Sequence, residues 1–252
     1  MDSSEQGESS DNPSKGSTAD SALGERLELV GTVLASPPQI HRQGTGVWST
    51  EQSCYEFMAR HVQHGSRTLE TGAGVSTVLF TGWGCDHLCV VPASDQRDGI
   101  LAYCAERGID PGSLSFDLRG SEWALPTLPP DASYDLVFID GSHGFPLPII
   151  DWFYGAAHLR QGGVVVFDDF QLPQVSFWLE WFLDRDPRWE NLQSTSKWTA
   201  YRRHSSGPLG EIQTQQPFVE SRDSQSPPKL LDMARGLTRR VHAWSNERRV
   251  RR

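Results

Sequence analysis

The chain has 252 residues, which is enough for one full α/β domain with tails or for two small domains. Its net charge of −9 argues against a general nucleic-acid-binding protein, and a hydrophobic content of 37% still allows a packed core. The charge is unevenly spread, because residues 229–252 carry eight basic and two acidic side chains and leave the remainder strongly acidic.

Neither secretion nor membrane insertion is expected from the sequence. The first 22 residues lack the basic start and apolar centre of a secretory signal, and no apolar run approaches the roughly 18 residues that a membrane span needs. Of the four cysteines, Cys85 and Cys89 are spaced C-x3-C, without a second pair at metal-ligand spacing. We therefore expect a cytoplasmic protein with reduced thiols, whose cysteines act as small buried hydrophobic residues.

The N-terminal part of the chain is expected to be a tail followed by the start of a folded domain. Residues 1–22 are polar and glycine-rich and have no periodicity, which predicts disorder. The stretch Leu27–Ala35 fits either a short strand or a helix. Ser49 is expected to open a helix, because Gln52 follows at the spacing of a capping box. The domain is predicted to run from residue 23 to residue 203.

The centre of the chain alternates short apolar stretches with helical patterns. Strands that are apolar throughout and alternate with helices imply a parallel sheet covered on both faces. Near the end, Trp189–Gln193 and Trp198–Arg202 are joined at hairpin spacing, which predicts an antiparallel last pair. The other expected strands are 67–70, 87–91, 114–116, 134–140 and 162–170, and the expected helices are 75–83, 95–107, 148–160 and 175–183.

Two segments are predicted after this domain. Residues 204–228 are polar and rich in proline and serine, which is typical of a linker. Residues 229–252 fit a basic amphipathic helix with one apolar seam. Such a helix could dock on its own domain or on a second copy in a homodimer, the segment could be disordered, or it could contact an anionic membrane or nucleic acid.

The stretch "LETGAGVST" predicts a ligand-binding turn between a strand and a helix. Glycine at Gly72 and Gly74 lets the backbone turn tightly and lets a ligand approach it, at the strand end where open α/β sheets bind ligands. A dinucleotide turn would need a third glycine where Thr77 stands. The acid Glu70 would repel a pyrophosphate but would attract a cation. S-adenosylmethionine, which carries a sulfonium and an amino group, is therefore favoured over NAD.

This stretch, followed by "YDLVFIDGSHGFPLPIIDWFYGAAHLRQGGVVVFDDF", resembles the class I S-adenosylmethionine-dependent methyltransferases over about residues 49–203. It is closest to their small-molecule branch with an "IDG-x-H" strand end. The resemblance implies a Rossmann-like, doubly wound and mostly parallel seven-stranded sheet in one domain with flexible tails. It implies methyl transfer to an oxygen, or to a nitrogen, of a small-molecule acceptor. Alternatives are a non-catalytic or regulatory protein that keeps this fold and an NAD-dependent oxidoreductase.

The resemblance also implies which residues bind the cofactor. The methionine end is assigned to Glu70, Gly72, Ala73, Gly74 and Ser76, the adenine to Ser121, Glu122 and Trp123, and the junction with the acceptor to Asp140. The family usually holds the ribose with an acid at the end of the second strand, where this sequence has Pro92 and Ala93. Asp95 is a displaced candidate for that contact.

Catalysis is expected around the acids and the histidine that follow the fourth and fifth strands. His143, beside Asp140, is either a general base for a hydroxyl acceptor or only a partner of backbone groups in its turn. Phe145 is expected to contact an aromatic or apolar acceptor. Asp140, Asp168 and Asp169 would repel one another without a counter-ion. A resemblance to catechol-type enzymes implies Mg²⁺ there, whereas Asp168 and Asp169 could instead cap a turn.

Overall fold

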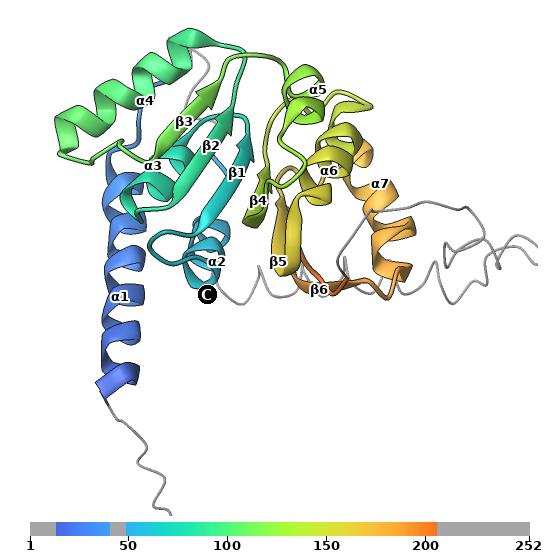
Figure 1. The fold of residues 1–252 in the computed structure, drawn as a ribbon, viewed down its shortest axis with the longest axis horizontal. Helices are drawn as coiled ribbons and strands as arrows, with labels where there is room; N and C mark the ends of the chain where they lie inside the picture. Colours follow the sequence, from blue (N-terminus) through green and yellow to red (C-terminus); the bar gives the residue numbers. More distant parts are fainter. Residues whose placement is uncertain (1–13, 41–48, 206–252) are drawn as a thin grey trace, which may run out of the picture.

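A seven-stranded sheet forms the centre of the part of the chain that this computed structural model describes, residues 14–40 and 49–205 (Figure 1). Its strands are β1 (Arg67–Thr71), β2 (Asp86–Val90), β3 (Leu114–Asp117), β4 (Tyr134–Ile139), β5 (Leu159–Phe167), β6 (Trp189–Ser194) and β7 (Thr199–Arg203). They lie in the order β3-β2-β1-β4-β5-β7-β6. Strands β1 to β5 pair in parallel, and β7 runs antiparallel to both β5 and β6. The predicted doubly wound sheet with an antiparallel last pair is confirmed.

The strand order reverses between β1 and β4. From β1 the chain builds outward through β2 to β3, and then crosses back to place β4 on the other side of β1. The carboxyl ends of β1 and β4 therefore lie side by side, and the backbone N–H of Asp140 donates to the carbonyl of Thr71 at 3.1 Å. Ligands of open α/β sheets bind at such a reversal.

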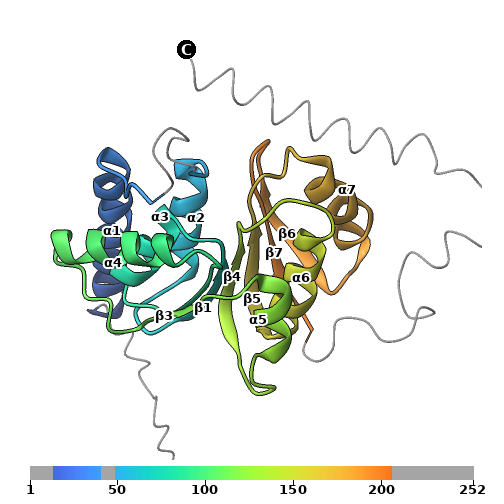
Figure 2. The ribbon, with the colours of Figure 1, turned by 90° about the horizontal axis from the view of Figure 1, so that it is seen from above.

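Helices cover the two faces of the sheet separately (Figure 2). One face carries α1 (Ser14–Ala35), α2 (Gln52–His61), α3 (Val75–Gly82) and α4 (Ser94–Arg107), and the other carries α5 (Ser121–Ala124), α6 (Leu147–Ala157) and α7 (Pro173–Trp181). Short 3-10 turns follow α5 at Leu125–Thr127 and α7 at Leu183–Arg185. Each layer has its own apolar core, because successive residues of a strand point to opposite faces. On β4, Leu136 and Phe138 pack under α2 and α3, whereas Val137 and Ile139 pack under α6 and α7.

The N-terminal boundary differs from the prediction. Helix α1 begins at Ser14, inside the segment that was expected to be a disordered tail as far as residue 22, and it includes all of Leu27–Ala35. Val30 and Val33 are buried, and Leu27 and Leu34 pack against the same core. These apolar residues recur at helical spacing and pack against α2 and α3. Their burial stabilises a helix where composition alone indicated a disordered tail.

Two other helix boundaries differ for local reasons. Helix α2 begins at Gln52 with Glu51 as its N-cap and not at Ser49, and the hydroxyl of the neighbouring Thr50 bonds to Asp168 instead of capping the helix. Helix α6 ends at Ala157 and not at residue 160, since β5 already begins at Leu159.

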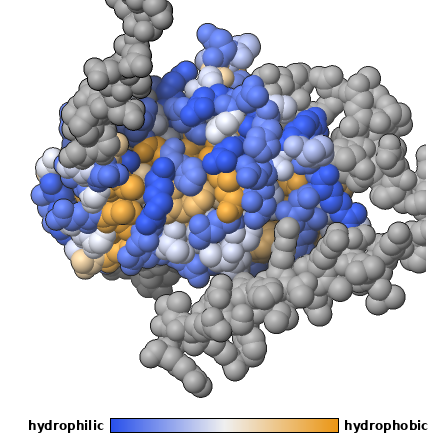
Figure 3. Space-filling view, turned by 90° about the horizontal axis from the view of Figure 1, so that it is seen from below, coloured by the Kyte–Doolittle hydropathy of each residue, from blue (hydrophilic) through white to orange (hydrophobic). Residues whose placement is uncertain are grey.

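Several predictions concern residues outside this structure. The linker 204–228 is described only at its first two residues, and the basic helix 229–252, with the homodimer it would form, lies wholly outside the described residues. Within 14–40 and 49–205, no helix combines the length and the apolar character that a membrane crossing requires. On the face drawn in Figure 3, apolar residues reach the surface in several areas that polar residues separate.

Asp151 on α6 gives a test of the packing. The residue is 1% exposed, and neither carboxylate oxygen has a well-formed hydrogen bond to a described residue. Burial raises the pKa of Asp151 to about 6, although the hydroxyls of Ser121 and Thr71 lie close enough to oppose this rise. Its folded pKa exceeds the unfolded one, so the carboxyl costs no stability while it is protonated at low pH. The cost grows as the pH rises from the unfolded pKa to the folded pKa, and it then levels off at about 3 kcal/mol.

Asp151→Asn is therefore expected to raise the free energy of unfolding at pH 8 by up to about 3 kcal/mol and by clearly less at pH 4.5. Denaturant unfolding at the two pH values measures both gains. Asp131→Asn, at an exposed carboxyl, is the matched control and should change neither value. An Asp151→Asn protein that is less stable than the parent at pH 8 would contradict the assigned burial cost.

Candidate active site

The turn between β1 and α3 is built around Gly72. Its φ is +93°, in the left-handed region that favours glycine, and an added Cβ would lie 2.4 Å from the backbone oxygen of Asp140. Its N–H donates to the carbonyl of Val90 at 3.0 Å. Gly72 therefore fits tightly between the ends of β2 and β4. A larger residue would have to push β4 away.

Gly74 is needed for a different reason. Its φ of −173° is extended backbone that any residue can adopt, and an added Cβ would meet only the Ser76 Oγ, at 3.9 Å. Neither backbone strain nor a protein neighbour explains a glycine here. Close approach by a ligand does explain it. The Thr71 hydroxyl, at the same strand end, is buried and lies beside the Asp151 carboxylate. The unexplained glycine at Gly74 fits a cofactor lying along this turn.

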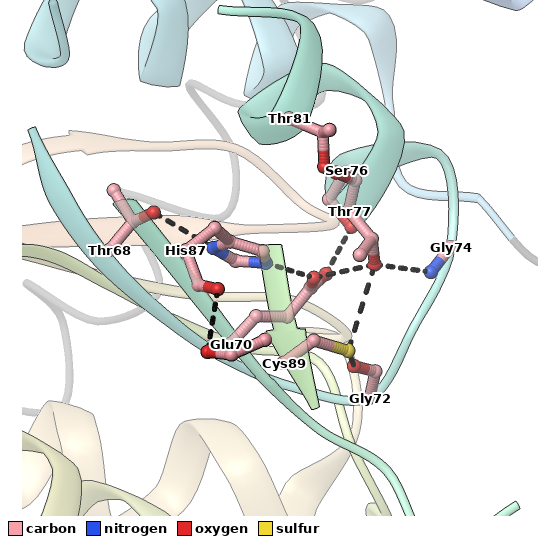
Figure 4. A network of polar contacts seen from close by, with 10 residues as sticks. Thr68, Glu70, Gly72, Gly74, Ser76, Thr77, Thr81, His87 and Cys89 are labelled. Atoms are coloured by element: carbon pink, nitrogen blue, oxygen red, sulfur yellow. Dashed lines mark hydrogen bonds and ion pairs between the residues drawn. The ribbon is translucent and has the colours of Figure 1, made fainter. Parts of the chain in front are cut away.

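The side chain of Glu70 connects this turn to α3 and β2 through hydrogen bonds (Figure 4). Its side chain is fully buried and accepts a hydrogen bond from the Ser76 hydroxyl, one of 2.7 Å from the Thr77 hydroxyl and one of 3.1 Å from His87 Nε2. A buried carboxylate is expensive unless donors satisfy it, and here three donors come from α3 and β2. The acid thus fixes the first turn of α3 against the two central strands.

The same network reaches the two glycines. The Thr77 hydroxyl accepts the N–H of Gly74 at 3.0 Å, and the Cys89 thiol donates to the carbonyl of Gly72 at 3.1 Å. Burial, and then the nearby Glu70 charge, raise the pKa of the Cys89 thiol well above its usual range, so it stays a neutral donor. On the other side, His87 Nδ1 lies 2.8 Å from the Thr68 hydroxyl. The side chains of Glu70 and Ser76 are therefore engaged with each other, and direct contacts from them to a cofactor stay a prediction.

The predicted acids come together at the ends of β4 and β5. Asp168 is 3% exposed, accepts a hydrogen bond from the Thr50 hydroxyl, and its N–H donates to the carbonyl of Ile139 at 3.1 Å. Burial raises the pKa of Asp140 well above its ordinary value, and the charges of Asp168 and Glu70 raise it further. The cluster therefore favours a proton on Asp140 in place of a third negative charge.

Lys197 is the cation of this cluster, and sequence reasoning missed it. It lies in the hairpin between β6 and β7, and its Nζ contacts Asp169 Oδ1 and is 3.6 Å from Asp168 Oδ2. Burial alone would raise the pKa of Asp169, but hydrogen bonds from Lys197 and Gln171 and the nearby His143 bring it below its ordinary value. The sequence carried only a weak signal for this pairing, which is one basic residue in a hairpin expected to lie beside the fifth strand.

His143 points into the cluster and not toward the backbone of its own turn. Its Nδ1 is 3.2 Å from Asp169 Oδ2, and its Nε2 is 4.0 Å from Asp140 Oδ1 and has no hydrogen-bond partner among the described residues. Burial lowers the pKa of His143, and Lys197 lowers it too, against the opposing charges of Asp169 and Asp168. The imidazole is therefore neutral near pH 7. We assign the proton to Nδ1, where Asp169 accepts it, which leaves the Nε2 lone pair available.

The three acids do not fit a magnesium ion in this arrangement. Within residues 14–40 and 49–205, no three His, Cys, Asp or Glu side chains are placed so that they could share one metal ion. The ammonium of Lys197 already contacts the oxygens of Asp168 and Asp169 that would have to bind it.

The remaining predicted residues lie along the same edge of the sheet without direct contact to this cluster. Ser121 and Glu122 are partly buried in α5, after β3, and Trp123 beside them is 69% exposed. Asp95 is exposed in the first turn of α4, after β2. Their contacts with adenine and ribose stay predictions.

Comparison with known proteins identifies the central part of the chain. Residues 69–170 match the family model described as a methyltransferase domain. A search of curated proteins found no match. The matched span begins in β1 and ends just after β5, so it contains the glycine turn, His143 and all three acids of the cluster.

Solved structures share the fold at low sequence identity. The O-methyltransferase TomG from Streptomyces achromogenes, in complex with SAM, is 18% identical with a TM-score of 0.51, and the match covers 73% of this chain and 90% of that one. The SAH-bound methyltransferase PaMTH1 from Podospora anserina is 15% identical, with a TM-score of 0.50 and coverage of 79% and 100%. Cofactor-bound Rv0187 from MTB is 17% identical, with the same TM-score and coverage. Residues 69–170 therefore match a methyltransferase domain, and the chain shares the fold of solved methyltransferases.

Proposed function

We propose that this chain is an S-adenosylmethionine-dependent methyltransferase that methylates an oxygen of a small-molecule acceptor, with nitrogen as the less favoured acceptor atom. The observation that carries the proposal is the position of His143. Its unpartnered Nε2 lies in the loop after β4, next to the glycine turn whose Gly72 packs on Asp140. The proposed base and the proposed cofactor turn thus lie at the neighbouring ends of β4 and β1.

The residues of the chain have distinct roles in this proposal. Bound S-adenosylmethionine would supply an electrophilic methyl group. The turn at Gly72 and Gly74 would hold its methionine end. His143 Nε2 would take the proton that a hydroxyl acceptor loses, and Asp169 would stabilise the resulting imidazolium through Nδ1.

The proton acceptor is also the reason to favour oxygen. A hydroxyl is a weak nucleophile until a base removes its proton, whereas a neutral amine can attack with its lone pair. A neutral histidine held by a carboxylate is the group that such a hydroxyl needs. Phe145, two residues after His143, is 75% exposed and favours an acceptor with an apolar body. The cytoplasmic location is part of the proposal, and it is supported by four cysteines that are all buried free thiols.

Gly74→Ala tests the cofactor turn. We expect unchanged thermal stability, because the added methyl meets only the Ser76 Oγ at 3.9 Å. We expect S-adenosylmethionine affinity to fall at least about tenfold, because the methyl enters space that the ligand would use. Isothermal titration with S-adenosylmethionine, and with NAD as the rival ligand, measures this.

Gly31→Ala is the matched control for this substitution, since an added Cβ at this position in α1 meets nothing within 4 Å. It should bind S-adenosylmethionine as the parent does. Parent protein that binds NAD but not S-adenosylmethionine would overturn the proposed cofactor. Unchanged affinity in Gly74→Ala would remove the ligand from this turn.

His143→Ala tests the base. Turnover should fall at least about tenfold while S-adenosylmethionine affinity changes little, since the imidazole acts on the acceptor and not on the cofactor. Release of S-adenosylhomocysteine is measured over a panel of phenols, with anilines as the nitrogen counterpart. His204→Ala, at a half-exposed histidine paired with Glu190, is the control. Equal turnover on phenols in His143→Ala and its parent would leave His143 without a catalytic role.

A further inference from the structure

We propose that Lys197 is a built-in cation of the acceptor site, which forms ion pairs with Asp168 and Asp169, positions His143 through Asp169, and takes the place that a divalent metal ion would need. The inference rests on the proposed function. It concerns how the acid cluster of that site is neutralised. In this proposal Lys197 is a positioning residue, because it acts on the acceptor through Asp169 and His143.

The hairpin that carries Lys197 is fixed on both sides. The Thr195 hydroxyl accepts the N–H groups of Lys197 and Trp198 at 3.0 and 3.1 Å, and the carbonyl of Lys197 accepts the N–H of Phe170 at 2.8 Å. Trp198 is fully buried, and its indole N–H donates to the Ser53 hydroxyl of α2 at 3.0 Å. The side chain of Lys197 is 28% exposed and starts from an anchored backbone, so the ammonium is directed at the acids by the fold.

The charges of the cluster nearly balance when Lys197 is counted. Asp168 and Asp169 share one ammonium, Asp140 is held toward its protonated form by burial and by Asp168, and His143 is neutral. The Asp168 carboxylate has a further donor in the Thr50 hydroxyl. A divalent ion would add two positive charges where this set needs no more than one. It would also have to displace an ammonium that is already in contact.

Lys197 reaches the base through Asp169. Asp169 has a φ of 52°, in the left-handed region that Asp tolerates better than most residues. One oxygen takes Lys197 and the Gln171 amide, which donates at 2.7 Å, and the other faces His143 Nδ1 at 3.2 Å. A carboxylate held at one oxygen presents the second in a fixed direction. Lys197 therefore helps to set which nitrogen of His143 carries the proton.

Manganese binding, read by electron paramagnetic resonance, tests this inference without requiring activity. The parent protein should not bind Mn²⁺ at the cluster. Lys197→Met should bind it at least about tenfold more tightly than the parent, because two carboxylates lose their cation. Lys197→Arg keeps the charge and should resemble the parent. Adding Asp168→Asn to Lys197→Met should abolish the gained binding. Arg202→Met, which removes the arginine partner of the exposed Glu190, is the control for non-specific binding.

The outcomes separate this inference from the proposed function. Parent protein that binds Mn²⁺, and loses it on Asp168→Asn alone, would overturn the role of Lys197. That result would not bear on the proposed function, which S-adenosylmethionine binding and turnover test separately. Failure of Lys197→Met to gain Mn²⁺ while its circular dichroism matches the parent would also overturn it. If Lys197→Met does not fold, the parent, Lys197→Arg and Asp168→Asn proteins still decide the question. Turnover of the parent should be unchanged by EDTA.

Discussion

The site depends on one buried carboxylate. Glu70 lies at the end of the central strand and is fully removed from water, where an unsatisfied charge would cost more than the domain could tolerate. Donors from α3 and β2 satisfy it, and one of them, the Thr77 hydroxyl, also accepts the N–H of Gly74, while the neighbouring Cys89 thiol donates to the carbonyl of Gly72. The cost of burying Glu70 is thereby offset by groups that also shape the turn. A polar network of this kind specifies one backbone path for the turn between β1 and α3.

A second group of charges, Asp168 and Asp169 with Lys197, lies at the end of β5. The parallel order of β1, β4 and β5 brings their acidic ends to one edge, and the antiparallel β7 returns the chain so that the β6–β7 hairpin adds Lys197 to that edge. Glu70 is satisfied mainly by neutral donors, whereas Asp168 and Asp169 face an ammonium. The difference fits their surroundings, because the side chain of Glu70 is fully buried while that of Asp169 is 22% exposed. His143 lies beside Asp169, and burial lowers its pKa.

The sequence predicted the fold well because apolar periodicity and glycine spacing are local signals. All seven strands lie within a few residues of their predicted positions, since a buried parallel strand is recognisable from its own residues. The start of α1 was missed because its helix depends on packing against α2 and α3. The edge of the sheet at which the site lies was also predictable, because the carboxyl ends of parallel strands meet at one edge. The direction of the Glu70 side chain, the pairing of Ser76 with it, and Lys197 were not predictable, because each depends on contacts between elements that are distant in sequence.

The central claim is that the turn after β1 and the loop after β4 form one site for a cofactor and an acceptor. A crystal structure with S-adenosylhomocysteine tests this most directly. The account predicts that the homocysteine part lies along Gly72 and Gly74, with the sulfur facing a cavity that His143 Nε2 borders. Ligand bound at another edge of the sheet, or a sulfur that faces away from His143, would contradict it.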